Sequence, residues 1–346
     1  METNKIYTED CRETLKRMPE QFINCCVTSP PYYGLRDYGH DGQIGLEETP
    51  EQYVQKLVEV FRLVREKMKD DGTLWLNLGD SYWGGKGQSG QAWSTNNQDR
   101  ETLQKAQHQI AGTKETRPTD RKHDTIKPKD LIGIPWMVAF ALRADGWYLR
   151  QDIIWHKPNP MPESVTDRCT KSHEYIFLLS KSQQYYYDHE AVMEKSTTFE
   201  NRPSGVVRNR IYKYDSKENI YPQAYLKNIK GNMSDNGVTR TTAGLNLKTQ
   251  AEKTTENRNK RSVWTVNTKP YKDAHFATFP EKLIEPCILA GCPEKGIVYD
   301  PFMGAATTAL VSLRANRQFV GSELNPDYVK IGMKRIMPLL TQYALF

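Results

Sequence analysis

The chain has 346 residues, enough for one large α/β domain with an insertion or for two domains. Hydrophobic residues make up 38% of it and charged residues 26%, so a packed core is feasible, and no apolar run predicts a transmembrane span or a signal peptide. The six cysteines have no Cys-x-x-Cys pair and no regular spacing, which argues against a disulfide framework, a structural zinc site or any other metal site. Reduced, buried thiols are typical of a cytosolic protein.

The net charge of +6 is unevenly distributed. Residues 195–264 contain 14 Lys and Arg against 6 Asp and Glu, an excess of +8, so the remainder of the chain carries −2. A basic segment on a slightly acidic body is typical of a protein that meets a polyanion through one surface. A solvated basic loop would have the same composition.

Short apolar runs bounded by turn formers predict buried strands, and amphipathic stretches between them predict helices. In chain order, the strands are expected at 22–28, 73–78, 152–156, 174–179, 296–299 and 318–321, and the helices at 50–69, 131–142, 279–289 and from about Thr307. Strands that alternate with helices predict a mainly parallel sheet covered on both faces.

Two polar stretches interrupt this alternation. Residues 84–127 are rich in Gly, Gln, Ser, Asn and Thr with almost no apolar period, which predicts a mobile loop or a segment that a partner orders. Residues 195–264 are basic and rich in Asn, with scattered aromatic residues. We therefore expect one α/β domain built from 1–194 and 265–346, with 195–264 as a separate region.

The first segment that carries chemistry is Thr28-Ser29-Pro30-Pro31-Tyr32-Tyr33, directly after a predicted strand. Two consecutive prolines rigidify a turn at the carboxyl end of that strand, where open α/β sheets bind ligands. The Ser29 hydroxyl and the Pro30 carbonyl offer two acceptors for the two hydrogens of an exocyclic amine, and the Tyr32 ring can stack on the base. A surface turn could have the same residues, so this segment alone leaves both interpretations open.

The second segment runs from Asp300 through Gly304 to Thr308. A strand ends at Asp300, the glycine allows a tight turn, and the following helix presents free N–H groups to an anion such as a methionine carboxylate. The next strand ends at Glu323, where a carboxylate is placed to accept hydrogen bonds from a ribose diol. In that order, these features predict a site for a nucleoside cofactor.

Ser29-Pro30-Pro31-Tyr32 and Asp300-Pro301-Phe302-Met303-Gly304 together resemble the amino-methyltransferases of restriction–modification systems, and their order resembles the permuted β group. Residues 76–82 are similar to the strand and loop after the family's first helix, and residues 145–160 to the segment beside the target-base pocket. Residues 275–280 are similar to a wall of the cofactor pocket. The family usually has a second glycine where this chain has Ala305-Ala306. Alanine costs little there if φ stays negative, so we expect a slightly altered pocket.

The resemblance implies a Rossmann-like class I methyltransferase fold, circularly permuted, with a basic insert. Its sheet would have seven mainly parallel strands with helices on both faces, and the strand from Lys5 to Thr8 would lie beside the carboxyl-terminal strands. S-adenosyl-L-methionine would be the cofactor. The candidate site residues are Ser29, Pro30, Pro31 and Tyr32 for catalysis; Asp10, Phe279, Asp300, Phe302, Gly304, Thr307, Thr308 and Glu323 for the cofactor; and Tyr33, Trp155 and Lys157 for the target base. Asp10 can equally be a helix cap, and both interpretations stay open.

The function implied is site-specific methylation of the N(4) amine of cytosine in double-stranded DNA, with the base flipped out and the methyl group transferred directly. The region 195–264 would recognise the target, the loop 84–127 would close on DNA, and a cognate restriction endonuclease would act separately. The nearest alternative is N(6)-adenine methylation, because Ser at position 29 leans toward cytosine only with exceptions. A methyltransferase acting on a protein amide and a non-catalytic DNA-binding protein of the same fold are more distant possibilities. The sequence gives neither the recognition site nor the oligomeric state.

Overall fold

A computed structural model describes residues 1–35, 40, 42–84, 118–195, 257–268 and 278–343. The chain divides into two compact units, Met1–Val192 with Arg261–Phe346, and Met193–Lys260. In the described part of the second unit, β6 (Glu194–Lys195) pairs antiparallel with β7 (Asn257–Arg258). Most of the expected target-recognition region 195–264 and of the expected loop 84–127 lies outside the described residues.

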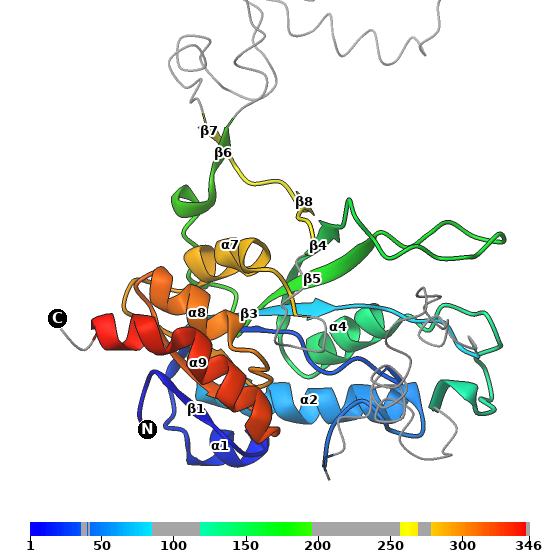
Figure 1. The fold of residues 1–346 in the computed structure, drawn as a ribbon, viewed down its shortest axis with the longest axis horizontal. Helices are drawn as coiled ribbons and strands as arrows, with labels where there is room; N and C mark the ends of the chain where they lie inside the picture. The colour runs from blue at the N-terminus through cyan, green and yellow to red at the C-terminus, as the bar shows by residue number, and fades with distance from the viewer. Residues whose placement is uncertain (36–39, 41, 85–117, 196–256, 269–277, 344–346) are drawn as a thin grey trace, which may run out of the picture. The chain divides into compact units, whose positions relative to one another are not determined.

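In the described part of the larger unit, eight strands form one sheet in the order β1-β10-β9-β2-β3-β5-β4-β8 (Figure 1). Only β5 among them is antiparallel to its neighbours, which confirms the mainly parallel sheet. The sheet has one strand more than the seven expected, because three residues pair with the end of β4 to form β8. The strands are β1 Lys5–Tyr7, β2 Ile23–Thr28, β3 Met68–Leu78, β4 Tyr148–His156, β5 His173–Ser180, β8 Val263–Thr265, β9 Ile297–Asp300 and β10 Gln318–Ser322.

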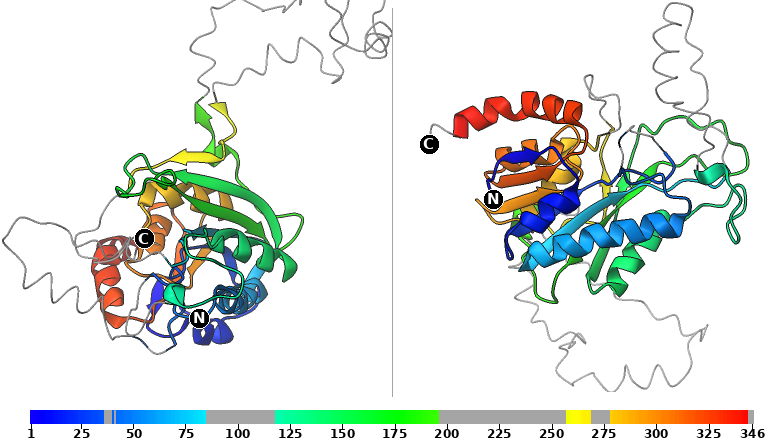
Figure 2. Two further views of the ribbon diagram at one scale, coloured as in Figure 1. Left: turned by 90° about the vertical axis from the view of Figure 1, so that its right-hand side faces the viewer. Right: turned by 90° about the horizontal axis from the view of Figure 1, so that it is seen from below.

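Helices cover both faces of this sheet (Figures 1 and 2). One face carries α1 (Cys11–Arg17), α2 (Pro50–Lys67) and α4 (Ile134–Ala144), and the other carries α7 (Glu281–Gly291), α8 (Thr307–Arg314) and α9 (Pro326–Tyr343). Two short 3-10 turns lie at Pro118–Asp120 and Glu190–Val192. None of the helices in the described part of the chain is both long and apolar enough to cross a membrane.

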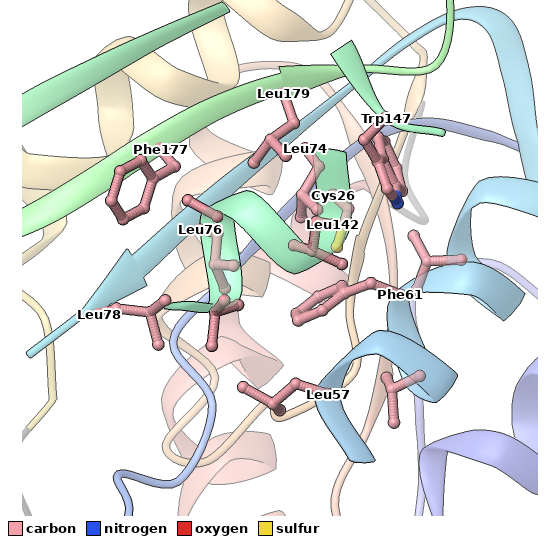
Figure 3. Packing of buried hydrophobic residues seen from close by; sticks show 14 of the residues in the cluster. Cys26, Leu57, Phe61, Leu74, Leu76, Leu78, Leu142, Trp147, Phe177 and Leu179 are labelled. Atoms are coloured by element: carbon pink, nitrogen blue, oxygen red, sulfur yellow. The ribbon is translucent and has the colours of Figure 1, made fainter. Parts of the chain in front are cut away.

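The core lies on both faces of β2, because consecutive side chains of a strand point to opposite sides. Cys26 joins a cluster formed with α2 and α4, and Figure 3 shows it among Leu57, Phe61 and Leu142. Cys25 joins the cluster on the other face, which includes residues of α7. All six residues of β2 are buried, as a central strand of a doubly covered sheet requires.

Local signals set the helix that follows β2. Thr49 caps α2 by accepting from the Gln52 N–H, Pro50 occupies the first turn, and Tyr53, Leu57 and Phe61 form part of its buried stripe. The sequence predicted this helix within two residues at its carboxyl end.

The two halves of the sheet meet between β2 and β9, which are neighbouring parallel strands. The chain leaves β2 toward α2 on one face and leaves β9 toward α8 on the other. The carboxyl ends of these strands therefore flank a topological switch point, the place where open α/β sheets bind ligands. On the far side of β9, β1 pairs with β10, with Lys5 opposite Val320, which confirms the expected placement of the first strand.

Candidate active site

A hydrogen bond from α2 fixes the turn that follows β2. Tyr53, which is fully buried, donates its hydroxyl hydrogen to the Pro31 carbonyl at 2.7 Å. Thr28 ends the strand, Pro30 is buried, and Ser29 is partly exposed. The two prolines and the Tyr53 hydrogen bond together fix a turn that presents a hydroxyl group at the switch point.

The Tyr32 ring rests on the end of β3. A methyl group on Gly79 would come within 2.5 Å of Cε2 of the Tyr32 ring, so only glycine allows this close approach. The Tyr32 hydroxyl donates to Oε2 of Glu174 at 2.7 Å and lies 3.5 Å from the Ser29 hydroxyl, which donates to it. Burial, followed by the negative charge of Glu174, raises the pKa of Tyr32, so the phenol stays neutral.

Glu174 connects four strand ends near this turn. Its carboxylate accepts from Tyr32, from Nδ2 of Asn77 on β3 at 3.3 Å, and from the Lys157 ammonium just beyond β4. The Lys157 ammonium also lies 4.2 Å from the centroid of the Trp155 ring. The structure thus brings Lys157, predicted to contact the base, next to Tyr32.

The other two aromatic residues expected at the base lie in the core. Tyr33 is 2% exposed, packs against Tyr53 with ring centroids 5.5 Å apart, and donates to the Glu48 carbonyl. Trp155 is 4% exposed and donates through Nε1 to the Val266 carbonyl at 2.8 Å. In this structure both rings are packing residues, which leaves Tyr32 as the stacking candidate.

Asp300 connects the turn after β2 with the turn after β9. Its buried carboxylate accepts from the Thr28 hydroxyl at 2.6 Å, the Thr308 hydroxyl at 2.6 Å and the Phe302 N–H at 3.0 Å. Burial raises its pKa to about 6, against the lowering effect of these hydrogen bonds. The hydrogen bond from Thr28 to Asp300 therefore joins the two predicted segments, which are 272 residues apart in sequence.

Glu323 lies at the end of β10, beside the glycine turn. One carboxylate oxygen accepts from the Gly304 N–H at 2.8 Å and the other from the Asn325 N–H at 2.9 Å. The carboxylate keeps lone pair capacity beyond its backbone partners, and the side chain is only partly buried, so the residue suits the hydroxyl groups of a ribose. Burial raises the pKa of Glu323. Gly304 has φ +51° and no side chain, which leaves its backbone approachable. These features fit S-adenosyl-L-methionine.

The expected negative φ at Ala305-Ala306 is wrong for Ala306. Ala306 has φ +59°, in the left-handed region that costs an alanine about 1–2 kcal/mol. Its methyl group is accommodated by Gly332 of α9, where an added Cβ would come within 2.8 Å of the Ala306 Cβ. The second glycine of the family pattern is thus replaced by a strained alanine and a glycine on the neighbouring helix.

The remaining cofactor candidates have partners inside the protein. Thr308 donates to Asp300, and Thr307 accepts from the Arg335 guanidinium at 2.9 Å. Asp10 caps α1 by accepting from the Arg12 N–H at 2.8 Å and forms an ion pair with the Arg12 side chain. Phe302 and Phe279 are partly buried and pack against the core clusters. Their contacts with a cofactor stay predictions.

Neither thiol near the turn is placed to act as a nucleophile. Cys25 and Cys26 are both fully buried in β2, and burial raises the pKa of each. Within the described ranges, no group of three or more His, Cys, Asp and Glu side chains could hold a metal ion.

Sequence reasoning did not assign a role to Glu174, Asn77 or Tyr53. The sequence places Glu174 only at the start of a predicted strand. An acidic residue beside an apolar run, with Lys157 in a nearby motif, is nevertheless a signal for an ion pair. Tyr53 was counted as part of a helix stripe, and nothing local indicates that its hydroxyl reaches Pro31.

The chain is similar to DNA methyltransferases over nearly its whole length. The DNA methylase family (N6_N4_Mtase) matches residues 23–334. The type II methyltransferase M.Cfr9I of Citrobacter freundii is 41% identical over 331 residues, which are 96% of this chain and 87% of that protein. M.SmaI of Serratia marcescens is 41% identical over 333 residues, with 96% and 90% covered.

Two solved structures have the same fold at low sequence identity. PvuII DNA methyltransferase, described as cytosine-N4-specific, matches with a TM-score of 0.57 at 17% identity and covers 97% of this chain and 86% of its own. A putative DNA modification methylase from Thermus thermophilus, complexed with S-adenosyl-L-methionine, matches with a TM-score of 0.52 at 18% identity and covers 97% and 93%.

Proposed function

The chain belongs to the DNA methylase family and is a DNA methyltransferase that uses S-adenosyl-L-methionine, and on that premise we propose that it methylates the N(4) amine of cytosine at a specific site in duplex DNA. The observation that carries the proposal is the hydrogen bond from Thr28 to Asp300. This bond holds the turn after β2, which offers acceptors for an amine, against the turn after β9, which has the features of a nucleoside site. An amine and a methyl donor bound there would face each other.

We propose roles for the cofactor residues from the motifs in which they stand and from the contacts of Glu323. Glu323 accepts from the ribose hydroxyls, Gly304 lets the cofactor approach the backbone, and Phe302 lines it. Asp300 and the start of α8 at Thr307 and Thr308 face the methionine end. Asp10 and Phe279 contribute to the adenine side and to the pocket wall, as the family resemblance implies.

The proposed mechanism is direct transfer: the amine attacks first, the cofactor would be released as its neutral thioether product, and the methylated nitrogen, then strongly acidic, gives its proton to water. When bound, the cofactor supplies an electrophilic methyl group on a sulfonium. Ser29 and the Pro30 carbonyl orient the amine, and Tyr32 stacks on the flipped base. A serine hydroxyl is too weak a base to deprotonate a neutral amine beforehand, so positioning provides most of the rate. The buried Cys25 and Cys26 argue against a covalent enzyme–base intermediate.

Two observations favour cytosine over adenine. Ser29 occupies the position where cytosine enzymes of the resembled family tend to have serine, and the fold is shared with PvuII DNA methyltransferase, whose description is cytosine-N4-specific. N(6)-adenine methylation is the second candidate, because both bases offer an exocyclic amine to the same pair of acceptors.

We also propose that residues 195–264 recognise the target sequence and that 84–127 close on DNA, although most of both segments lies outside the described residues. A cognate restriction endonuclease that acts separately would be the functional partner. A cytoplasmic location fits an enzyme that modifies genomic DNA.

The test is mass spectrometry of nucleosides from DNA treated with the pure protein and cofactor. N(4)-methylcytosine is expected, while N(6)-methyladenine or 5-methylcytosine would overturn the assignment. Ser29→Ala should lower turnover about 10²-fold while the affinity for the cofactor product, measured by calorimetry, stays close to that of the parent. Sequencing of DNA from expressing cells, with a readout that separates the methylated amines, would then give the recognition site.

A further inference from the structure

A directed chain of hydrogen bonds runs from the proposed catalytic serine to Glu174. The Ser29 hydroxyl oxygen lies 3.5 Å from the Tyr32 hydroxyl oxygen, a contact longer than the usual range of about 2.5–3.0 Å for such a bond, and Tyr32 donates to Oε2 of Glu174 at 2.7 Å. An ionised carboxylate has no hydrogen to give, so the Tyr32 hydrogen must point toward Glu174. The Tyr32 oxygen can then only accept, so in a hydrogen bond between the two hydroxyl groups Ser29 is the donor.

The other partners of Glu174 keep its carboxylate in the accepting role. Asn77 donates through Nδ2 to Oε2, and the Lys157 ammonium donates to Oε1. With Tyr32, three donors from three different segments converge on one carboxylate that is 16% exposed. A neutral or rotated group at this position would leave at least one of these donors unpaired.

The consequence appears at Ser29. A free serine hydroxyl can rotate and either donate or accept. A Ser29 hydroxyl that donates its hydrogen to Tyr32 has only lone pairs left for the base, so toward the base it acts as an acceptor. The cytosine amine presents hydrogens there, whereas the O4 carbonyl of uracil or thymine presents lone pairs.

We propose that Glu174 is a positioning residue that makes the target pocket select an amine over a carbonyl, acting through Tyr32 and Ser29. This inference rests on the proposed function. A base with a carbonyl in place of the amine would meet two acceptors and leave both unpaired in a water-poor site, a mismatch that enzymes use for strong discrimination.

The experiment measures discrimination between bases, which general destabilisation would not change. Fluorescence anisotropy gives the affinity of the protein, loaded with the cofactor product, for two duplexes with cytosine or uracil at the mapped target position. The same two duplexes serve every variant, so any effect of the mismatched pair cancels in the ratio. The parent is expected to prefer cytosine at least about tenfold.

Glu174→Ala and Tyr32→Phe should each lower this preference by about tenfold, because either change frees the Ser29 hydroxyl to donate. The double variant should lose no more than either single variant, since both act on one chain of bonds. The preference of Glu174→Gln, whose side chain has nearly the same shape, should lie between those of the parent and of Glu174→Ala, because an amide can also donate. Cofactor affinity should stay unchanged in all of them.

Asp145→Asn is the matched control. Asp145 begins the segment 145–160, but its carboxylate, 12% exposed at the end of α4, pairs with Arg62 of α2 and takes no part in the hydrogen bonds of Glu174. It should keep the parent preference. An unchanged preference in both Glu174 variants, or losses that multiply in the double variant, would overturn the inference. If the parent leaves every amine of the DNA unmethylated, the proposed function fails instead.

Discussion

At Asp300, burial and hydrogen bonding act in opposite directions on one carboxyl group, and burial dominates. The folded pKa of about 6 lies above the ordinary 3.8, so the folded state binds the proton more tightly than the unfolded state does. Well below pH 3.8 both states are protonated and the group has no effect. As the pH rises, the unfolded state ionises first and stability falls until the folded carboxyl ionises as well, near pH 6.

We therefore expect Asp300→Asn to change the pH dependence of unfolding. Relative to this variant, the parent should lose about 3 kcal/mol of unfolding free energy between about pH 3 and pH 7, because the shift of about two pKa units is worth about 1.4 kcal/mol per unit. Urea unfolding at several pH values measures the difference. A difference that stayed constant across this range would contradict the buried, ionisable Asp300.

Ala306 and Gly332 form a pair whose energies should be coupled. Ala306→Gly should stabilise the protein by about 1 kcal/mol, because glycine adopts the positive φ without strain. Gly332→Ala should destabilise it by about 1–3 kcal/mol through the clash with the Ala306 methyl group. In the Ala306→Gly background the same change should become neutral or favourable, since alanine suits a helix interior. Thermal unfolding of the four proteins tests this, and simple additivity would contradict it.

The Glu323 carboxylate gives a prediction about cofactor affinity. Glu323→Ala should weaken binding of the cofactor product by about 3 kcal/mol or more, because two charge-assisted hydrogen bonds are lost. Glu323→Gln should lose less. Calorimetry measures both, and unchanged affinity in the alanine variant would remove Glu323 from the proposed site.

Some residues of the candidate site could be predicted from sequence and others could not. Ser29, Tyr32, Asp300 and Glu323 stand in short motifs beside apolar runs, so local pattern and resemblance single them out. Glu174 receives its role from partners on three other segments, and those contacts exist only after the sheet forms. The two groups differ because the role of Glu174 depends on which segments lie close together in the folded protein, and the spacing of residues in the sequence does not give that.

At the scale of elements, β2, α2, α8 and β10 were predicted closely because burial and capping signals lie within their own residues. The start of α4 was not. The helix was expected from Leu131 but begins at Ile134, because the Asp80 carboxylate accepts from the Gly133 and Ile134 N–H groups, and Gly133 has φ +84°. A cap that comes from more than 50 residues away leaves no local signal. The β8 strand and α9 were also not predicted.

Asp80→Ala should therefore destabilise α4 by about 1–2 kcal/mol, the usual cost of removing an N-cap. Asp80→Asn keeps an acceptor oxygen and should cost less. Hydrogen exchange of the α4 amides checks this locally, with α7, which begins after Pro280 without a side-chain cap, as an internal control. Equal protection of α4 in the parent and the alanine variant would contradict the capping role.

At the scale of the whole molecule, the uneven charge predicts how binding responds to salt. The ends of the segment 196–256 are adjacent, because Lys195 pairs with Asn257 across β6 and β7, so a short glycine-containing turn can replace the segment. If the segment makes about five phosphate contacts, its loss should reduce the slope of log affinity against log salt by about 4–5. Filter binding between low and physiological salt measures this. A variant with the parent's slope and sequence preference would refute the assignment.

The pairing of β1 with β10 also has a consequence for the order of events during synthesis. β1 leaves the ribosome before the other strands of the sheet, and its hydrogen-bonding partner emerges more than 300 residues later, with Lys5 opposite Val320. Contacts of such long sequence separation form late, because loop closure must precede them. For most of translation β1 would thus be an exposed strand without a neighbour, a kind of edge prone to mispairing. Its three-residue length limits that risk.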